Sequence, residues 1–278
     1  MKVCRFGKGR VGVVVDDALI DLSDSLPPQA LDFPVLWLAA QGRQALAEMI
    51  RLGNRVAMDG VSWLSPIAAP GKVVAAPVNY RAHVEEMLAN GQAHGHLLTD
   101  IRQAGLFLKA SSSVVGPAQG IAQRFLERRT DYELELCVVI GRTASNLQAA
   151  DALAHVAGYC LGLDITVRGP EDRSFRKSID SYCVLGPWLT TADELGDPGT
   201  VDLELHVNGE VRQRANTSDM VLDVAELIVF ASSFYTLQAG DVIMTGTPQG
   251  VGPIRPGDTL VARGTRLGSM TTRVRAAT

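Results

Sequence analysis

The run from Tyr132 to Ile140, YELELCVVI, restricts the possible folds of this chain more than any other stretch. Its first half places Glu133 and Glu135 two positions apart, and side chains two positions apart on a strand point to the same side. Its second half, CVVI, is apolar without alternation, which is typical of a strand covered on both faces. The second half therefore favours packed layers on both sides of this strand, and the two like charges of the first half would lie about 7 Å apart.

The two glutamates have two interpretations. An amphipathic strand with one solvated face would leave both carboxylates in water, and such strands are common. On a covered face the two charges would repel each other unless a cation lay between them. Asp164, in CLGLDIT, is a third carboxylate set between apolar residues. Three hard oxygen ligands without cysteine or histidine at zinc spacing favour Mg²⁺ or Mn²⁺, with water or substrate completing an octahedron.

Length and pattern predict one large domain and a smaller N-terminal module. The 278 residues, 46% of them hydrophobic, can bury a sizeable core. Predicted strands outnumber helices without a regular βαβ rhythm, which favours an α+β fold over a doubly wound sheet. Asn208-Gly209 predicts a β-hairpin. Residues 65–72, SPIAAPGK, are the best boundary, so we expect a small mixed module over 1–68 and a second unit over 69–278.

The charge, the cysteines and the hydropathy restrict the classes of binding partner and indicate the cellular compartment. The 26 basic and 30 acidic residues leave a formal charge of -4 without a long basic run, which disfavours nucleic acid and anionic membranes as partners. The four cysteines are far apart and show no C-x-x-C spacing, so reduced core thiols are favoured over disulfides or a zinc site. We expect neither a signal peptide nor a membrane span. The sequence predicts a cytoplasmic protein.

A predicted helix at 79–87, NYRAHVEEM, carries His83 and Glu86 three positions apart and hence on one face. A carboxylate beside an imidazole can orient it and let it take a proton from water. An exposed His–Glu pair without function is the ordinary alternative. The polar segment that follows, QAHGHLLTD at 92–100, is predicted to be mobile and is a candidate lid.

Five segments in series resemble one enzyme family. They are NYRAHVEEM, DYELELCVVIG, LDITVR, KSIDSYCVLGPWL and DVIMTGTPQGVG. In this order and at these separations they are similar to the fumarylacetoacetate hydrolase family, over about residues 70–270. The module at 1–68 also resembles the N-terminal extension that many members carry. The resemblance implies a mixed sheet folded on itself, in a homodimer.

The resemblance implies a metal site and a set of catalytic residues. The expected ligands of a divalent cation, Mg²⁺ or Mn²⁺, are Glu133, Glu135 and Asp164. The pair His83 and Glu86 would activate a water molecule, and Lys177 would contact the substrate oxyanion. Judged from the residues alone, Lys177 would be an ordinary solvated charge.

The resemblance also implies a substrate pocket, whose expected contact residues are Tyr80, Lys109, Arg168 and Thr247. Thr247 would contact the substrate carboxylate; judged from the residues alone, it would be part of a turn and Lys109 a solvated charge. One stretch departs from the family pattern. Where members commonly read D-x-x-x-R-D-x-Q, this chain keeps Arg168 but has Gly169 and Glu171, in LDITVRGPE.

Together these residues suit a substrate with a 2-oxo acid end. The metal would chelate its carboxylate and 2-oxo oxygen. His83 would deprotonate a water that attacks the distal carbonyl of a 1,3-diketone, and carbon–carbon cleavage would release a pyruvate enolate. The resemblance thus implies an acylpyruvate hydrolase, with fumarylpyruvate or maleylpyruvate from aromatic breakdown as candidate substrates. Two alternatives stay open: an isomerase or decarboxylase of a 2-hydroxy-dienedioate, and a metal-stabilised binding protein without catalysis.

Overall fold

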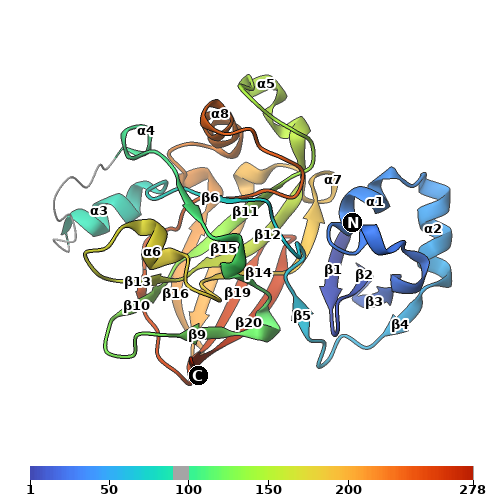
Figure 1. Ribbon diagram of the computed structural model, residues 1–278, viewed down its shortest axis with the longest axis horizontal. Coiled ribbons are helices and arrows are strands. Elements are labelled where there is room, and N and C mark those ends of the chain that lie inside the picture. The colour runs from blue at the N-terminus through green and yellow to red at the C-terminus, as the bar shows by residue number, and fades with distance from the viewer. Residues whose placement is uncertain (90–99, 278) are drawn as a thin grey trace.

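The computed structural model of the chain describes residues 1–89 and 100–277. Its strands form three β-sheets of twelve, three and five strands, with helices around them (Figure 1). Strands and helices do not repeat as βαβ units, so the predicted α+β fold is confirmed. Among these residues no helix is long and apolar enough to cross a membrane. The candidate lid lies, except for its last residue Asp100, outside the described residues.

The N-terminal residues build one end of the twelve-stranded sheet. Their strands are β1 (Lys2–Phe6), β2 (Arg10–Val15), β3 (Ala18–Asp21), β4 (Asn54–Val56) and β5 (Trp63–Leu64). Two helices follow β3, namely α1 (Pro34–Ala40) and α2 (Arg43–Leu52). Strand β1 pairs antiparallel with β14 (Cys183–Thr191), so the sheet continues from the N-terminal residues into the rest of the chain. The division between 68 and 69 is not marked by separate sheets, and it stays a prediction.

The remaining strands of this sheet are β6 (Val73–Ala75), β7 (Phe107–Lys109), β8 (Val114–Val115), β11 (Leu134–Ile140), β12 (Val156–Asp164) and β17 (Val242–Met244). The order β4-β3-β2-β1-β14-β12-β11-β17-β6-β7 places β11 between β12 and β17, while β5 pairs with β1 and β8 with β14. Every residue of β11 is buried. The central position of β11 explains why its sequence is so apolar.

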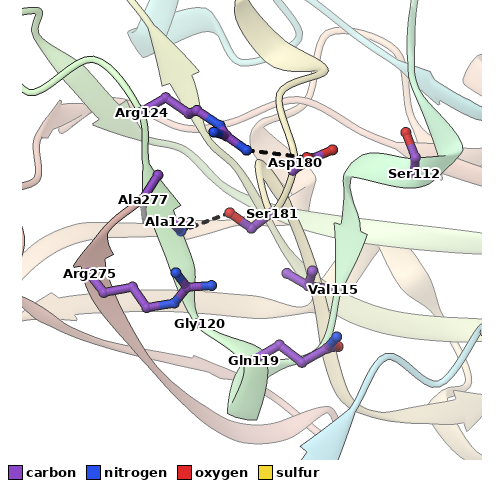
Figure 2. Close-up of a pocket in the computed structure, with 10 residues that line it drawn as sticks. All are labelled: Ser112, Val115, Gln119, Gly120, Ala122, Arg124, Asp180, Ser181, Arg275 and Ala277. Carbon is purple, nitrogen blue, oxygen red and sulfur yellow. Dashed lines mark hydrogen bonds and ion pairs between the residues drawn. The ribbon is translucent and has the colours of Figure 1, made fainter.

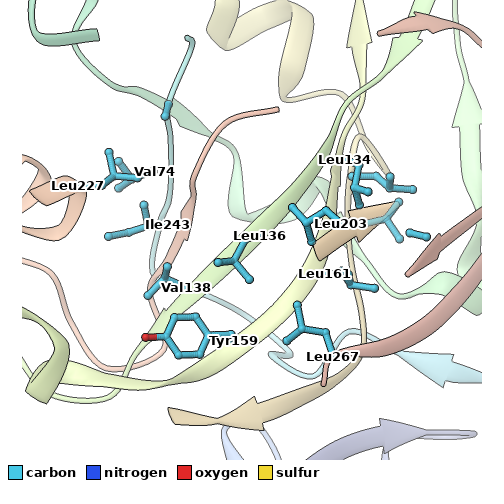
Figure 3. Close-up of a cluster of buried hydrophobic side chains, with 14 of the residues drawn as sticks. Val74, Leu134, Leu136, Val138, Tyr159, Leu161, Leu203, Leu227, Ile243 and Leu267 are labelled. Carbon is cyan, nitrogen blue, oxygen red and sulfur yellow. The ribbon is translucent and has the colours of Figure 1, made fainter. Parts of the chain in front are cut away.

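The two faces of β11 pack against different layers. Leu136 and Val138 belong to a core cluster with Leu203, which Figure 3 shows beside the strand. Cys137 and Val139 point to the other face and pack with residues of the N-terminal strands and of α1, among them Leu38. The prediction of a strand covered on both faces is therefore confirmed. All four cysteines are free and buried, as predicted for core thiols.

Two smaller sheets complete the strand architecture. The three-stranded sheet consists of β10 (Thr130–Tyr132), β13 (Thr166–Val167) and β18 (Gly252–Pro253). The five-stranded sheet consists of β9 (Ile121–Gln123), β15 (Asp202–Val207), β16 (Glu210–Asn216), β19 (Thr259–Gly264) and β20 (Gly268–Ala276). Strands β15 and β16 form the predicted hairpin, and Asn208 and Gly209 adopt the positive φ angles that its turn requires.

The other helices are short. They are α3 (Arg81–Ala89), α4 (Ile101–Ala104), α5 (Ala149–Ala152), α6 (Arg173–Lys177), α7 (Ala192–Leu195) and α8 (Val224–Phe234). The chain also has single 3-10 turns, namely η1 (Ser23–Ser25), η2 (Pro28–Ala30), η3 (Ser111–Ser113), η4 (Pro117–Gln119), η5 (Leu153–His155), η6 (Pro198–Thr200) and η7 (Thr217–Asp219). In Figure 1, α3 and α6 lie on the same side of the molecule, near β10 and β13.

Candidate metal centre and active site

Three carboxylates meet where the central strands begin and end. Glu133 directly precedes β11, Glu135 lies in β11, and Asp164 is the last residue of β12. The N–H of Asp164 donates to the carbonyl of Glu133 at 2.8 Å, which holds the two strand ends side by side. One ligand oxygen from each carboxylate lies within 4.8 Å of the other two. Two adjacent strands thus supply three oxygen ligands suited to a hard divalent cation.

The surroundings of these carboxylates exclude the solvated-face interpretation of the glutamates. Glu133 is 6% exposed and Glu135 is 1% exposed, so that interpretation is wrong. Burial, together with the charges of Asp164 and Glu133, raises the pKa of Glu135 well above its usual range. Burial alone would also raise the pKa of Glu133, but the charges of Lys177 and Arg168 lower it to about 2. A bound cation would relieve the repulsion that affects Glu135.

Lys177 is buried against the carboxylates. Its Nζ donates to Oε2 of Glu133 at 2.7 Å, to Oδ2 of Asp164 at 2.6 Å and to Oγ1 of Thr166 at 2.7 Å. Burial alone would lower its pKa, but the charges of Asp164 and Glu133 raise it, so the side chain carries a positive charge. The interpretation of Lys177 as a solvated charge is wrong, and the sequence prediction that it lies at the site is supported by this geometry.

Lys109 is also buried, on the other side of Asp164. Its Nζ donates to Oδ1 of Asp164 at 2.5 Å, to the carbonyl of Tyr182 at 3.0 Å and to the carbonyl of Lys177. An ammonium group has three N–H donors, and these three acceptors match them. Lys109 is therefore not a solvated charge. The geometry favours a role in orienting Asp164, and the substrate contact expected for Lys109 stays a prediction.

Arg168 reaches the same cluster from the three-stranded sheet. Its Nε donates to Oδ2 of Asp131 at 2.7 Å, and its Nη2 donates to Oε1 of Glu133 at 3.2 Å. Asp131 is fully buried and also accepts from Nε of Arg129 at 2.7 Å. Arg168 is thus brought to the metal-site carboxylates; its described contacts are with protein groups, and the substrate contact expected for it stays a prediction.

The unusual Gly169 and Glu171 form one structural unit with Arg128. Arg128 donates from Nη1 and Nη2 to the Glu171 carboxylate, at 3.0 Å and 2.7 Å. Its Nε and Nη2 also donate to the carbonyl of Arg168, at 3.1 Å and 2.9 Å. A Cβ on Gly169 would lie 1.9 Å from Nη2 of Arg128. The guanidinium occupies the space that a side chain at 169 would need, so both departures from the family pattern contact the same side chain.

His83 and Glu86 meet on α3, as predicted. Nδ1 of His83 lies 3.3 Å from Oε2 of Glu86, and the N–H of Gly250 donates to both oxygens of Glu86, at 3.1 Å and 3.2 Å. His83 is buried, so the alternative of an exposed pair is wrong. In the same loop as Gly250, the N–H of Gly246 donates to Oε2 of Glu135 at 2.7 Å. One loop therefore contacts both the His83–Glu86 pair and the carboxylate cluster.

The two remaining predicted contact residues are buried around the same region. Tyr80 directly precedes α3, and its hydroxyl has no hydrogen-bond partner in the part of the chain that the structure describes. Burial, then the charge of Glu135, raises the pKa of that hydroxyl. Thr247 lies in the loop after β17 and accepts a hydrogen bond from Nε2 of Gln213 at 2.9 Å. Sequence reasoning missed Gln213, although the hairpin register sets this polar residue opposite the buried Leu205.

A pocket of about 260 Å³ lies apart from these residues (Figure 2). In it, Arg124 lies 3.6 Å from Asp180, and the N–H of Ala122 donates to Oγ of Ser181 at 2.8 Å. The other residues around it are Ser112, Val115, Gln119, Gly120, Arg275 and Ala277. None of the predicted site residues lines this pocket, and we assign it no part in the chemistry.

Comparison with known proteins identifies the family. The family model described as fumarylacetoacetate (FAA) hydrolase C-terminal matches residues 72–275, which is most of the chain. The chain belongs to the fumarylacetoacetate hydrolase family. The resemblance seen in the five sequence segments is thereby confirmed, and residues 1–71 lie outside the matched region.

Relatives within the fumarylacetoacetate hydrolase family match over the full length. The chain is 48% identical to a maleylpyruvate hydrolase of Aquipseudomonas alcaligenes, over 99% of this chain and 100% of the relative. The crystal structure of the maleylpyruvate hydrolase from Sphingobium sp. SYK-6, in complex with manganese(II) ion and pyruvate, matches with a TM-score of 0.86 and 35% identity over all of both chains. A 5-carboxymethyl-2-hydroxymuconate delta-isomerase from Mycobacterium smegmatis matches with a TM-score of 0.74 and 31% identity, again over all of both chains.

Proposed function

We propose that this protein is a metal-dependent hydrolase that cleaves the carbon–carbon bond of an acylpyruvate, and that its substrate is maleylpyruvate. The observation that carries the proposal is the buried cluster of three carboxylates, which shares one loop with the His83–Glu86 pair. The full-length likeness to two maleylpyruvate hydrolases supports the substrate, and one of these was crystallised with manganese and pyruvate.

The residues of the cluster fit Mg²⁺ or Mn²⁺, the cofactors expected from the sequence. They are buried and offer only oxygen ligands, and burial together with their mutual repulsion raises the pKa of Glu135; a bound cation would relieve that repulsion. The ligands would be Glu133, Glu135 and Asp164. When bound, the metal polarises the 2-oxo acid end of the substrate as a Lewis acid.

His83 is the general base of the proposed reaction. With Glu86 at its Nδ1, the neutral imidazole carries its proton there and leaves Nε2 free to accept one from water. The hydroxide oxygen bonds to the distal carbonyl carbon, and the bond from this carbon to the pyruvate methylene then breaks. The electron pair leaves with the pyruvate part as an enolate, which takes up a proton to give pyruvate. General-base help of this kind is worth about 10² to 10⁴ in rate.

Lys177 stabilises the negative charge that develops on the 2-oxo acid end. Its ammonium is held in place by Glu133, Asp164 and Thr166, and it is charged because the two carboxylates raise its pKa against the effect of burial. A fixed positive charge in a buried site requires little reorganisation as the reaction proceeds. Thr247 and Tyr80, which are buried around the same region, are proposed to contact the substrate.

The proposal is tested by mixing the purified protein with Mn²⁺ and maleylpyruvate, and by following the enol absorbance and the products. We expect loss of absorbance with one pyruvate and one maleate formed for each substrate consumed. If metal binds but no acylpyruvate is consumed, the proposal is wrong and the binding-protein alternative is favoured.

Isomerisation or decarboxylation of a 2-hydroxy-dienedioate is the second candidate function. It is favoured by the structural match to a 5-carboxymethyl-2-hydroxymuconate delta-isomerase. Product analysis separates the two, since only hydrolysis releases pyruvate. An isomeric or decarboxylated product without pyruvate would favour this second candidate.

We also propose that the protein is a homodimer and works in the cytoplasm. Strand β7 ends the large sheet, and its Leu108 is 41% exposed beside Phe175, which is 47% exposed; a second copy would cover such apolar side chains. The four free cysteines suit a reducing compartment. Light scattering of the eluted protein should give twice the chain mass, and a monomer would contradict the dimer.

A further inference from the structure

Gln213 joins two parts of the site that are distant in the sequence. It is 1% exposed and is the one buried residue of β16. Its Oε1 accepts from the N–H of Leu134 at 2.9 Å, and its Nε2 donates to Oγ1 of Thr247 and to the carbonyl of Pro248, each at 2.9 Å. Leu134 stands between two metal-site glutamates, while Thr247 and Pro248 belong to the loop after β17. One amide therefore connects the metal strand to this loop.

The need for an amide at this point follows from the course of β17. This strand pairs with β11 between Cys137 and Val139, and the N–H of Thr245 then donates to the carbonyl of Leu136. At Gly246, whose φ is 97°, the chain turns away. The N–H of Leu134 is bonded by the side chain of Gln213 instead of by a strand. Buried backbone N–H groups are seldom left without a partner, so the amide oxygen completes the sheet edge.

The loop held by Gln213 carries the N–H that orients the catalytic pair. A Cβ on Gly250 would lie 2.1 Å from the carbonyl of Arg212, so the loop rests directly on the main chain beside Gln213. The N–H of Gly250 donates to both oxygens of Glu86, and Glu86 lies 3.3 Å from Nδ1 of His83. The contacts thus run from Gln213 through the loop to Glu86 and His83.

We propose that Gln213 is a positioning residue for the reaction, because it sets the Gly250 N–H against Glu86 and thereby fixes the orientation of His83. The inference rests on the proposed function for the roles of Glu86 and His83. Gln213 acts through Glu86 and not through contact with the substrate. The metal-site carboxylates are held in addition by strand pairing and by Lys109 and Lys177. Loss of the amide should therefore reduce turnover more than metal binding.

The test compares Gln213→Met, which keeps the length of the side chain but removes its hydrogen bonds, with the matched variant Gln123→Met. Gln123 is also a buried glutamine, and its Nε2 donates to a threonine hydroxyl, that of Thr130, at 3.3 Å. For both variants one measures kcat and KM with Mn²⁺ and maleylpyruvate, the Kd for Mn²⁺ and the melting temperature. Amide hydrogen exchange at Leu134 and Gly250 is measured with Mn²⁺ and oxalate present.

For Gln213→Met we expect kcat to fall about 10- to 100-fold while KM and the Mn²⁺ Kd change by less than about threefold. Exchange at Leu134 and Gly250 should be at least about tenfold faster. Gln123→Met should melt at a lower temperature yet keep kcat within about threefold. If Gln213→Met does not fold, Gln213→Asn is judged by the same criteria, because its amide is one methylene too short to reach both Leu134 and the loop.

Two results would overturn the inference. One is a kcat of Gln213→Met within about threefold of the unmodified protein. The other is a Mn²⁺ Kd that rises in parallel with the loss of kcat, because Gln213 would then only support the metal strand. If the unmodified protein consumes no acylpyruvate, the proposed function fails by itself. Exchange at Gly250 then decides the inference: faster exchange in Gln213→Met supports it, and unchanged exchange contradicts it.

Discussion

Lys109 donates a hydrogen bond to Oδ1 of Asp164 at 2.5 Å, and the two side chains are 0% and 1% exposed. A carboxylate in such a place needs a partner, since removing one member of a buried ion pair typically costs about 3–5 kcal/mol. Lys109→Met should therefore lower the free energy of unfolding by about 3 kcal/mol and weaken Mn²⁺ binding, because Asp164 loses its orientation. Urea unfolding and Mn²⁺ titration measure both effects. Unchanged metal affinity with a raised KM would instead show the substrate contact expected from the sequence.

The close approach of Arg128 to Gly169 predicts how a side chain at position 169, in the stretch that departs from the family pattern, would change stability and KM. Gly169→Ala should push the guanidinium away from Glu171 and from the Arg168 carbonyl. The loss of stability should be small, since this ion pair is near the surface, but KM should rise because Arg168 is displaced. In an Arg128→Ala background the same change should have little effect on KM. A double-mutant cycle with additive effects would contradict this account.

The raised pKa of Glu135 predicts that metal stabilises the protein more at higher pH. Burial and the charges of Asp164 and Glu133 raise this pKa in the folded state. The folded protein therefore holds the proton more tightly than the unfolded chain, and its stability falls as pH rises between the unfolded and folded pKa values. Mn²⁺ replaces the proton and removes this penalty. The rise in Tm on adding Mn²⁺ should grow as pH rises above the ordinary pKa of a glutamate carboxyl, and a rise independent of pH would contradict the assignment.

The proposed role of His83, paired with Glu86 on α3, predicts that turnover can be lost while metal binding is kept. His83→Asn should reduce kcat about 10²- to 10⁴-fold with an unchanged Kd for Mn²⁺, because His83 is not a ligand. Glu133→Gln should abolish both turnover and Mn²⁺ binding. Steady-state kinetics and calorimetric Mn²⁺ titration of the two variants measure this difference. Loss of Mn²⁺ binding in His83→Asn would show that the roles are wrongly divided.

The shared orientation of Glu133 and Glu135 could be predicted because its information is local, whereas adding Asp164 as a third ligand depended on a second segment and on the family resemblance. Spacing places Glu133 and Glu135 on one side of a strand, and the surrounding apolar run indicates that the strand is buried. The partners of these groups were harder to find, because they come from distant segments. Gln213 bonds a main-chain group 79 positions away, and Arg128 pairs with Glu171 across 43 positions. Gly169 and Glu171 therefore look like isolated departures in the sequence, while in the fold they share one partner.

The burial of the two lysines was not predictable for the same reason. Lysine is usually exposed, and only the assembled cluster of negative charges makes a buried ammonium favourable. Lys109 and Asp164 are 55 positions apart, and β7 and β12 are not neighbours in the sheet. The residue types indicate the chemistry, while tertiary packing decides which charges are neutralised.

The central claim is that Glu133, Glu135 and Asp164 bind one divalent cation at which the 2-oxo acid end of the substrate is held. The most direct test is a crystal structure of the protein with Mn²⁺ and pyruvate, using the anomalous signal to locate the metal. The account predicts one Mn²⁺ with an oxygen ligand from each of the three carboxylates and with the pyruvate carboxylate and 2-oxo oxygens completing its coordination. A bound Mn²⁺ that lacks any one of the three carboxylates as a ligand would contradict it.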